Sequence, residues 1–194
     1  MTARTLTYGE QSLARLLFGD AIDYTRVRIH DRGYFWRFQS RHTAVAPNGQ
    51  IYFNHEDFLT DFSQAGPKGI HWFMHEMVHV WQWQLGHRLR LRGACRIGLS
   101  YRYELAPDKR LGDYNMEAQG DLLADYFMLK FFNARGVIAQ QQYVDAVPLF
   151  EQVLADFLMQ PHAQRHLPGG SRQRYRIFRS RAKHRQSDQH EGKA

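Results

Sequence analysis

The chain is poor in cysteine, with Cys95 alone among 194 residues. A single thiol cannot form an internal disulfide, so the fold does not depend on an oxidising compartment. Long apolar runs are also missing, and without 18 or more consecutive uncharged apolar residues no membrane-spanning helix is expected. The first twenty residues hold only the short apolar group LARLLF, broken by Arg15 and followed by no small-residue cleavage site. We therefore expect no signal peptide, and synthesis and folding in the cytoplasm.

Net charge is nearly absent from most of the chain, although the total is +7. Residues 169–194 hold eight Lys or Arg against two acidic groups, whereas the preceding 168 residues hold eighteen basic and seventeen acidic groups. The basic character therefore belongs to the end of the chain. Most such runs are solvated, which disfavours a nucleic-acid function, although an Arg-rich segment containing RYRIF is able to grip phosphates and stack a base.

What the chain does have is enough apolar material for a core, at 43% hydrophobic and 14% aromatic residues. A length of 194 residues suits one domain with an appendage. We predict one domain over residues 1–168 and a flexible basic tail over 169–194, because the tail lacks apolar periodicity. No internal repeats are present.

The coarse pattern of elements indicates an α+β fold. A helix is predicted over residues 5–19, a half-buried strand over 24–30, and a hairpin over 42–54 around Pro47, Asn48 and Gly49. A helix is expected from Ile70 to Leu85, ending at Gly86, with apolar residues on all sides and hence in a central position. Two further helices are predicted over about 113–133 and 140–159, the last with a kink at Pro148.

The central predicted helix contains the string HExxH, formed by His75, Glu76 and His79. Four residues span 400° of a helix, so the two histidines lie about 40° apart on one face, where one tetrahedral Zn²⁺ can accept both imidazoles. Glu76 projects beside the metal, where its carboxylate can take a proton from metal-activated water. With 11 His and seven Glu in the chain, chance yields on the order of 0.02 such strings. The competing interpretation is a buried helix with hydrogen-bonded core histidines.

A peptidase zinc site needs a third protein ligand and an open fourth position. The extended motif HExxHxxGxxH fails, because Gln82 and Leu85 stand where it requires Gly and His. A glutamate from another helix is the other common solution. Glu117 lies 38 residues beyond His79 on the next predicted helix and is the preferred third ligand, ahead of Glu104 and Glu151.

Asp121 stands four residues after Glu117, on the same helical face. A ligand histidine usually donates its second ring N–H to a carboxylate, and Asp121 is placed to accept it. His71 lies one turn before His75, but no acidic residue follows it, so we expect a hydrogen-bonded core or rim histidine. Trp72, Trp81 and Trp83 are expected in the core or pocket wall.

Amide hydrolysis also requires a donor for the oxyanion that develops on the attacked carbonyl. Four residues are candidates by their nearness in sequence: Tyr101, Tyr103, Tyr114 and His87.

These motifs resemble those of the gluzincin clan of zinc metallopeptidases, in which HExxH is followed by a ligand Glu and, four residues later, an Asp. Here the matching strings are HEMVH and, 38 residues on, NMEAQGD. The strings FGDAIDYTRVRIH, PNGQIYF and HEMVHVWQ further resemble the metallopeptidase domains attached to bacterial type VI secretion spike proteins. They are also similar to the core domain of contractile injection systems. The resemblance covers about residues 6–133.

The resemblance implies a zincin-like fold and a zinc-dependent metalloendopeptidase with His75, His79 and Glu117 as ligands, Glu76 as general base and Asp121 beside a ligand histidine. It further implies an antibacterial effector that is exported without a signal peptide and acts on peptide or protein substrates in a target cell's periplasm. A secretion spike and a cognate immunity protein are the implied partners. The alternative function is a non-catalytic zincin-fold adaptor or scaffold of a secretion or contractile injection system.

Overall fold

The computed structural model of the chain describes residues 3–33, 44–87 and 99–170. These residues form a four-stranded sheet and four α-helices joined by short 3₁₀ turns. The α+β class predicted from the sequence is thus confirmed. The predicted basic tail lies outside the described residues except for Gly169 and Gly170, so the domain division at residue 168 stays a prediction.

The sheet is small and mixed, with the strand order β1-β2-β4-β3. β1 (Ala3–Thr5) pairs antiparallel with β2 (Arg28–Asp31), β2 pairs parallel with β4 (Ile51–Phe53), and β3 (Ala44–Val45) pairs antiparallel with β4. The predicted hairpin over 42–54 is therefore present as β3 and β4, and residues 42 and 43 lie outside the described residues. Gly49 in its turn adopts φ 76°, the left-handed region that favours glycine.

The strand predicted over 24–30 begins later than expected. Residues Tyr24–Arg26 form a 3₁₀ turn, because the Asp23 side chain accepts a hydrogen bond from the backbone N–H of Thr25. This local side-chain bond competes with strand pairing, which starts only at Arg28.

Helix α1 (Tyr8–Phe18) corresponds to the helix predicted over 5–19. Thr7 and Glu10 form a reciprocal capping box at its start, and Gly19 ends it with φ 52°. Glu10 is fully buried and also accepts hydrogen bonds from Arg4 and from the backbone N–H of Phe62. The start of α1 is thereby tied to β1 and to the segment that leads into the next helix.

Helices α2 (Gly66–Gln84) and α3 (Met116–Phe132) are the long helices predicted over 70–85 and 113–133. α2 starts four residues before the predicted start at Ile70, and Pro67 lies in its first turn. Backbone N–H groups of the first turn make no hydrogen bond within the helix, so the N–H that proline lacks costs nothing there. α3 starts late, because the Asn115 side chain caps it by accepting from the N–H groups of Glu117 and Ala118.

Helix α4 (Val147–Met159) is shorter than the helix predicted over 140–159. Residues Gln141–Tyr143 form a separate 3₁₀ turn, and Pro148 lies in the first turn of α4. The predicted kink at Pro148 is therefore wrong, since a proline in the first turn removes no helical hydrogen bond.

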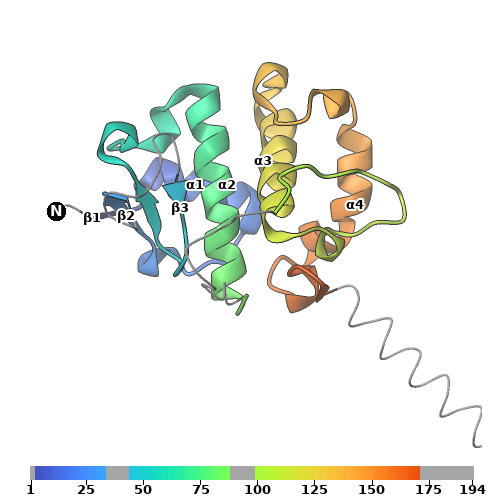
Figure 1. The fold of residues 1–194 in the computed structure, drawn as a ribbon, viewed down its shortest axis with the longest axis horizontal. Coiled ribbons are helices and arrows are strands. Elements are labelled where there is room, and N and C mark those ends of the chain that lie inside the picture. The colour runs from blue at the N-terminus through green and yellow to red at the C-terminus, as the bar shows by residue number, and fades with distance from the viewer. Residues whose placement is uncertain (1–2, 34–43, 88–98, 171–194) are drawn as a thin grey trace, which may run out of the picture.

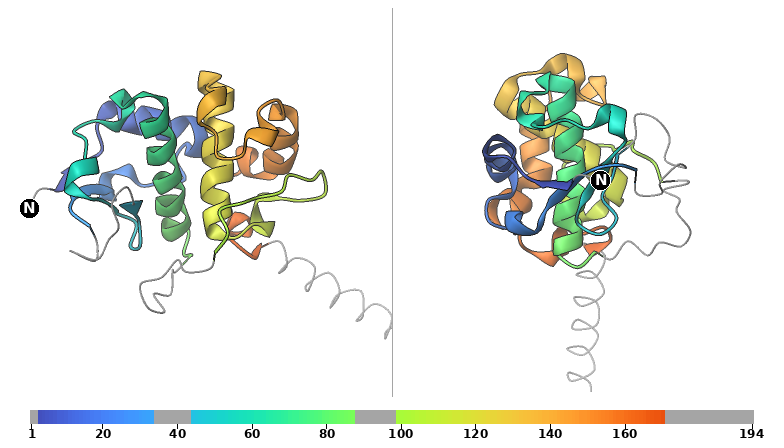
Figure 2. Two further views of the ribbon diagram at one scale, coloured as in Figure 1. Left: turned by 45° about the horizontal axis from the view of Figure 1, so that its top comes forward. Right: turned by 90° about the vertical axis from the view of Figure 1, so that its left-hand side faces the viewer.

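The four helices and the sheet are arranged around the α2 and α3 pair. The sheet lies on one side of α2, α1 crosses behind α2 in the view of Figure 1, and α4 lies on the far side of α3 (Figures 1 and 2). Both central helices are consequently enclosed by protein over most of their length, and residues 73–82 of α2 are all buried. The central position expected for the HExxH helix is confirmed. None of the helices in the described part of the chain combines the length and the apolar character that crossing a membrane would need.

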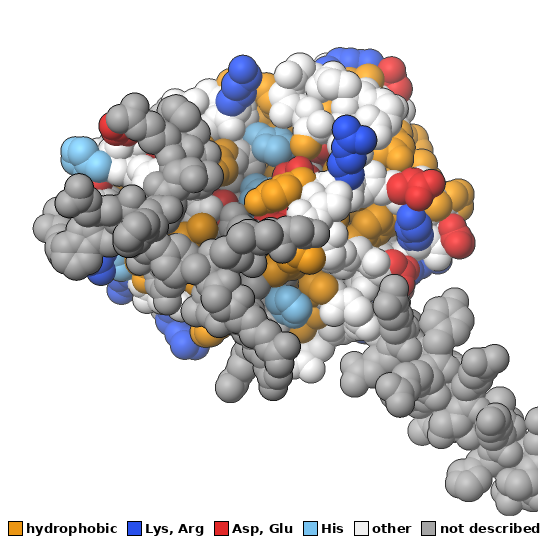
Figure 3. Space-filling model, in the orientation of Figure 1, with side chains coloured by type: hydrophobic (Ala, Val, Ile, Leu, Met, Phe, Trp, Pro, Cys, Tyr) orange, Lys and Arg blue, Asp and Glu red, His pale blue; other side chains and the backbone are white. Residues whose placement is uncertain are grey.

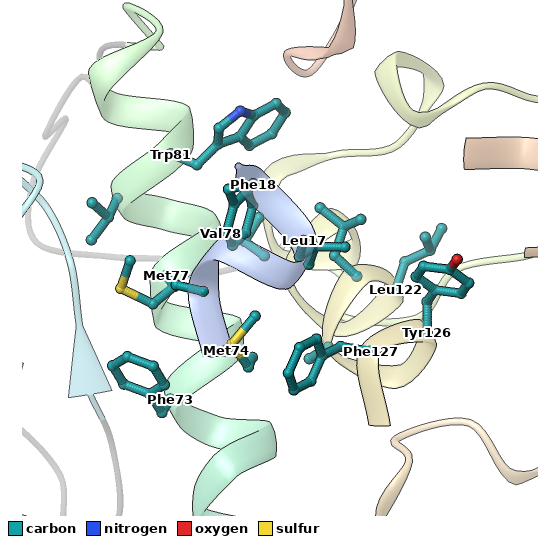
Figure 4. Packing of buried hydrophobic residues seen from close by; sticks show 14 of the residues in the cluster. Leu17, Phe18, Phe73, Met74, Met77, Val78, Trp81, Leu122, Tyr126 and Phe127 are labelled. Atoms are coloured by element: carbon teal, nitrogen blue, oxygen red, sulfur yellow. The ribbon is translucent and has the colours of Figure 1, made fainter. Parts of the chain in front are cut away.

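Aromatic and methionine side chains from three helices meet beside α2 (Figure 4). Trp81 is fully buried, stacks on Phe18 of α1 at 6.1 Å between ring centroids, and meets Phe157 of α4 edge-on at 5.3 Å. Its indole N–H donates to the carbonyl of Pro161 at 2.7 Å, so its one polar atom is satisfied. This core fixes α2 against its neighbours and holds the HExxH residues in position.

Candidate metal centre

The central helices α2 and α3 run antiparallel (Figure 1), and their polar residues face one another at regular spacing. Histidines on α2 recur every four residues, and so do the carboxylates on α3, so each histidine meets one acidic residue. Three such pairs occur: His79 with Glu117, His75 with Asp121, and His71 with Asp125. Two helices of suitable register therefore bring together residues that lie 38 to 54 positions apart in the sequence.

The first two pairs enclose a buried group able to hold a metal ion, made of His75, His79 and Glu117. The two Nε2 atoms are 3.1 Å apart, and Oε2 of Glu117 lies 3.4 Å from that of His75 and 3.3 Å from that of His79. His79 and Glu117 are fully buried, and His75 is 6% exposed. The structure thus brings together the three ligands predicted from the sequence.

Hydrogen bonds on the far side of each imidazole determine its tautomer. Nδ1 of His75 lies 2.8 Å from the Asp121 carboxylate, and Nδ1 of His79 lies 2.9 Å from Oε1 of Gln82. Both partners are acceptors here, so both Nδ1 atoms carry a proton, and both Nε2 atoms face Glu117. The three ligand-type atoms lie within 3.4 Å of one another, close enough to hold one cation between them.

The electrostatics of the site also favour positive charge. Burial lowers the pKa of His75, but the hydrogen-bonded carboxylates of Asp121 and Glu117, together with the nearby charge of Glu76, outweigh it and raise the pKa to about 10. The same three carboxylates would also stabilise a divalent cation at this position. Two imidazole nitrogens and one carboxylate oxygen form a donor set that fits Zn²⁺.

Close approach of α3 to His75 depends on Gly120. A Cβ atom at this position would lie 2.5 Å from Cε1 of His75 and 2.8 Å from each ring nitrogen. Only a residue without a side chain leaves room for the imidazole between the two helices. Gly120 is therefore part of the site, although it contributes no ligand atom.

Glu76, the predicted general base, is 1% exposed and directly follows His75 on α2. The two alternative candidates for the third ligand lie away from this group. Glu104 is exposed and pairs with Lys109 at 3.2 Å, and Glu151 pairs with Lys130 at 2.7 Å. Neither belongs to the buried group, so geometry favours Glu117 over both alternatives.

The four candidate oxyanion donors are now distinguished by their hydrogen bonds. Tyr103 donates its hydroxyl proton to Asp125 at 2.5 Å, and Tyr114 donates to the carbonyl of Glu104 at 2.8 Å. Burial raises the pKa of both phenols, so both protons are firmly held. Tyr101, in contrast, is 42% exposed and stacks on the ring of His75 at 5.9 Å.

His87, the fourth candidate, directly follows the last turn after α2, and its backbone N–H donates to the carbonyl of Gln82. Burial and the charge of His79 lower its pKa. Of the four, Tyr101 is the residue whose ring contacts a member of the buried group. Figure 3 shows histidine and acidic side chains among hydrophobic ones in the middle of the face that it displays.

His71 behaves as expected for a hydrogen-bonded histidine outside the metal group. Its Nε2 lies 2.7 Å from Asp125, which also accepts from Tyr103 and from the backbone N–H groups of Ala139 and Gln140. Asp125, Gly120, Gln82 and Gln119 were not predicted as site residues. A helical repeat of acidic residues at 117, 121 and 125 opposite histidines at 79, 75 and 71 was the available signal.

The class of protein is thus an α+β domain with a buried His-His-Glu group able to hold a metal ion. Comparison with known proteins narrows this class to one family. No family model matches the chain. An alignment 134 residues long, which covers 66% of this chain, shows 44% identity to the type VI secretion system spike protein VgrG2b of Pseudomonas aeruginosa. The matched part is only 13% of that spike protein's length.

A solved structure, the effector domain of Pseudomonas aeruginosa VgrG2b, matches the fold. The alignment has a TM-score of 0.65 and 38% sequence identity, and it covers 78% of this chain and 84% of that domain. The chain therefore belongs to the family of the VgrG2b effector domain.

Proposed function

We propose that the chain is a zinc-dependent metalloendopeptidase that serves as a type VI secretion effector. The observation that carries the proposal is the convergence of three buried electron-pair donors, from His75, His79 and Glu117, beside the carboxylate of Glu76. Three protein ligands of this kind would leave a bound Zn²⁺ free to act on water and substrate. Family membership supports the effector role, because the matched solved domain is described as an effector domain.

The three ligand residues would hold Zn²⁺, whose contribution is to polarise the scissile carbonyl and to make water acidic enough to attack at neutral pH. Glu76 takes the proton from the attacking water and delivers it to the leaving amine nitrogen. Its position next to His75 in a buried site keeps the carboxylate close to the reacting atoms. We propose that Tyr101, which is 42% exposed and stacks on the ring of His75, donates a hydrogen bond to the oxyanion.

Asp121 has a supporting role in this mechanism. Its carboxylate accepts the Nδ1 proton of His75 at 2.8 Å, which fixes the tautomer that offers Nε2 to the metal. The charge of Asp121 also makes the imidazole a stronger donor. The three side chains that surround His75 thus differ in function: one completes the ligand set, one moves the proton and one orients the ring.

Delivery is proposed from the relatives. The spike protein matched by the chain belongs to a secretion machine, so we propose a spike as the delivery partner, a periplasmic protein as the substrate and an immunity protein as the inhibitor in the producing cell. Export by this route needs no cleaved signal peptide.

The hydrolytic claim is tested with Glu76→Gln beside the matched control Glu104→Gln, both loaded with zinc. Casein, an unstructured protein, serves as the substrate, and zinc content is measured on the same samples. We expect Glu76→Gln to keep its zinc and to lose at least roughly 100-fold in cleavage rate, the minimum expected for a missing general base. The control should cleave as the wild type does.

Two results would contradict the proposal. Cleavage by Glu76→Gln at the wild-type rate would remove Glu76 from the mechanism. The second result is a zinc-loaded wild type that cleaves no protein but is as toxic in a bacterial periplasm as Glu76→Gln. This result would favour the non-catalytic adaptor.

A further inference from the structure

Beyond the ligands themselves, a chain of buried amides runs from His79 to two backbone segments far away in sequence. Gln82 on α2 and Gln119 on α3 are 1% and 0% exposed. Oε1 of Gln82 lies 2.9 Å from Nδ1 of His79, and Nε2 of Gln82 donates to Oε1 of Gln119 at 2.8 Å. Two glutamine side chains thus connect the imidazole to the rest of the core.

The direction of this chain is fixed at its far end. Nε2 of Gln119 donates to the backbone carbonyls of Leu111 at 2.8 Å and His166 at 2.9 Å. Carbonyl oxygens only accept, so the Gln119 amide must turn its nitrogen toward them and its oxygen toward Gln82. Leu111 precedes α3 and His166 follows α4, so two separate loops impose one orientation.

The orientation of the Gln82 amide is fixed in the same way. Gln82 meets Oε1 of Gln119 and, at 3.2 Å, the carbonyl of Met116, and both are acceptors. Both protons of its Nε2 are therefore used on them, and its oxygen is left for Nδ1 of His79. The imidazole must in turn carry its proton on Nδ1, which leaves Nε2 with the lone pair that faces Glu117.

Gln82 also solves an electrostatic difficulty of the site. Three carboxylates already lie around the proposed metal position, those of Asp121, Glu117 and Glu76. Glu117 and Glu76 are almost fully buried. A fourth carboxylate against the fully buried His79 would add an uncompensated buried charge, which is costly. A neutral amide provides the acceptor without that charge.

We infer that Gln82 and Gln119 are positioning residues for the metal ligand His79: their buried amide chain fixes its Nδ1–H tautomer and ring orientation. The inference rests on the proposed metal site and deepens it. Gln82 contacts the ligand directly, whereas Gln119 acts through Gln82. The two loops that contain Leu111 and His166 thereby take part in setting up the site.

The test compares Gln82→Met, Gln82→Glu and Gln119→Met with the wild type. Gln84→Met is the matched control, because Gln84 lies on the same helix and also uses both ends of its amide, but on the backbone of Asp23. Zinc affinity is measured by competition with a chelator. The tautomer of His79 is read in the metal-free protein from long-range ¹H–¹⁵N spectra, and folding is checked by thermal unfolding.

We expect Gln82→Met to lose about 100-fold and Gln119→Met about 10-fold in zinc affinity, the range found when partners of metal ligands are removed. His79 should be an Nδ1–H tautomer in the wild type and a mixture of tautomers in both Met variants. Gln82→Glu keeps the acceptor for Nδ1–H but loses the donors to Met116 and Gln119, so it should keep the proton on Nδ1 and unfold at a lower temperature. Gln84→Met should match the wild type in affinity and tautomer.

An Nε2–H tautomer of His79 in the wild type would overturn the inference, and so would Met variants that bind zinc within about twofold of the wild type. The wild-type tautomer decides the matter even where a Met variant fails to fold. Failure of the proposed function gives a different result: a wild type that binds no zinc but shows the Nδ1–H tautomer refutes the metal site and leaves the amide chain in place.

Discussion

Replacing Gly120 with alanine tests the geometry of the site with a single methyl group. The new Cβ would lie 2.5 Å from Cε1 of His75, whereas carbon atoms in ordinary contact are about 3.5 Å apart. The imidazole must therefore move by about 1 Å, or α3 must move away from α2. Metal sites accept ligand distances within about 0.2 Å of their usual values, so a shift of this size breaks coordination.

We expect Gly120→Ala to lose roughly 100-fold or more in zinc affinity and, without metal, about 1–3 kcal/mol in the free energy of unfolding, the usual cost of overpacking a core. An alanine in a helix interior normally stabilises by about 1 kcal/mol relative to glycine, so the sign of the effect is itself informative. Urea unfolding in the presence of EDTA measures the stability, and chelator competition measures the affinity.

Gly136→Ala is the matched control, because nothing lies within 4 Å of a Cβ at that position and its φ is not positive. It should bind zinc as the wild type does and be neutral or slightly more stable. The reasoning is refuted by a Gly120→Ala protein that keeps wild-type affinity and stability, since Gly120 would then not set the approach of α3 to His75.

Three further results are expected. Removal of zinc with EDTA should lower the thermal unfolding midpoint by roughly 5–10 °C, compared with protein in free zinc at 100 times the dissociation constant. At that concentration zinc binding contributes about 2.7 kcal/mol to the free energy of unfolding. An unchanged midpoint would argue against a zinc site in the folded chain. Asp125→Ala removes a buried acceptor shared by His71, Tyr103 and two backbone N–H groups, so urea unfolding should show a loss of about 3 kcal/mol or more, against under about 1 kcal/mol for the exposed Asp145→Ala. Growth assays in a bacterial host should show toxicity when the wild type is directed to the periplasm and none for Glu76→Gln; equal toxicity of the two would separate toxicity from hydrolysis.

The buried His-His-Glu group could be predicted from the sequence, because helical geometry alone places the two histidines of HExxH on one face. Glu117 followed from a second helical pattern at a suitable distance, and the buried group contains it. Local chemistry that competes with periodicity was harder to predict. Pro148 was expected as a kink, and it instead occupies the first turn of α4.

Apart from Asp121, the supporting residues were not predicted, because their roles depend on tertiary contacts. Tyr101, Tyr103 and Tyr114 are equivalent in sequence, and only the fold shows that two of them donate to Asp125 and to the Glu104 carbonyl. Gln82 appeared in the sequence as a residue that breaks an extended motif and as the last residue of the string HEMVHVWQ, with no role assigned to its side chain. Its contact with His79 depends on the orientation of Gln119, which is determined by carbonyls on two distant loops.

The central claim is that His75, His79 and Glu117 hold one zinc ion. The most direct test is the metal content of purified, zinc-supplied protein by mass spectrometry, for the wild type, Glu117→Ala and the control Glu104→Ala. The account predicts about one zinc per chain in the wild type and in Glu104→Ala, and its loss in Glu117→Ala. A wild type without zinc, or a Glu117→Ala protein that keeps as much as the wild type, would contradict it.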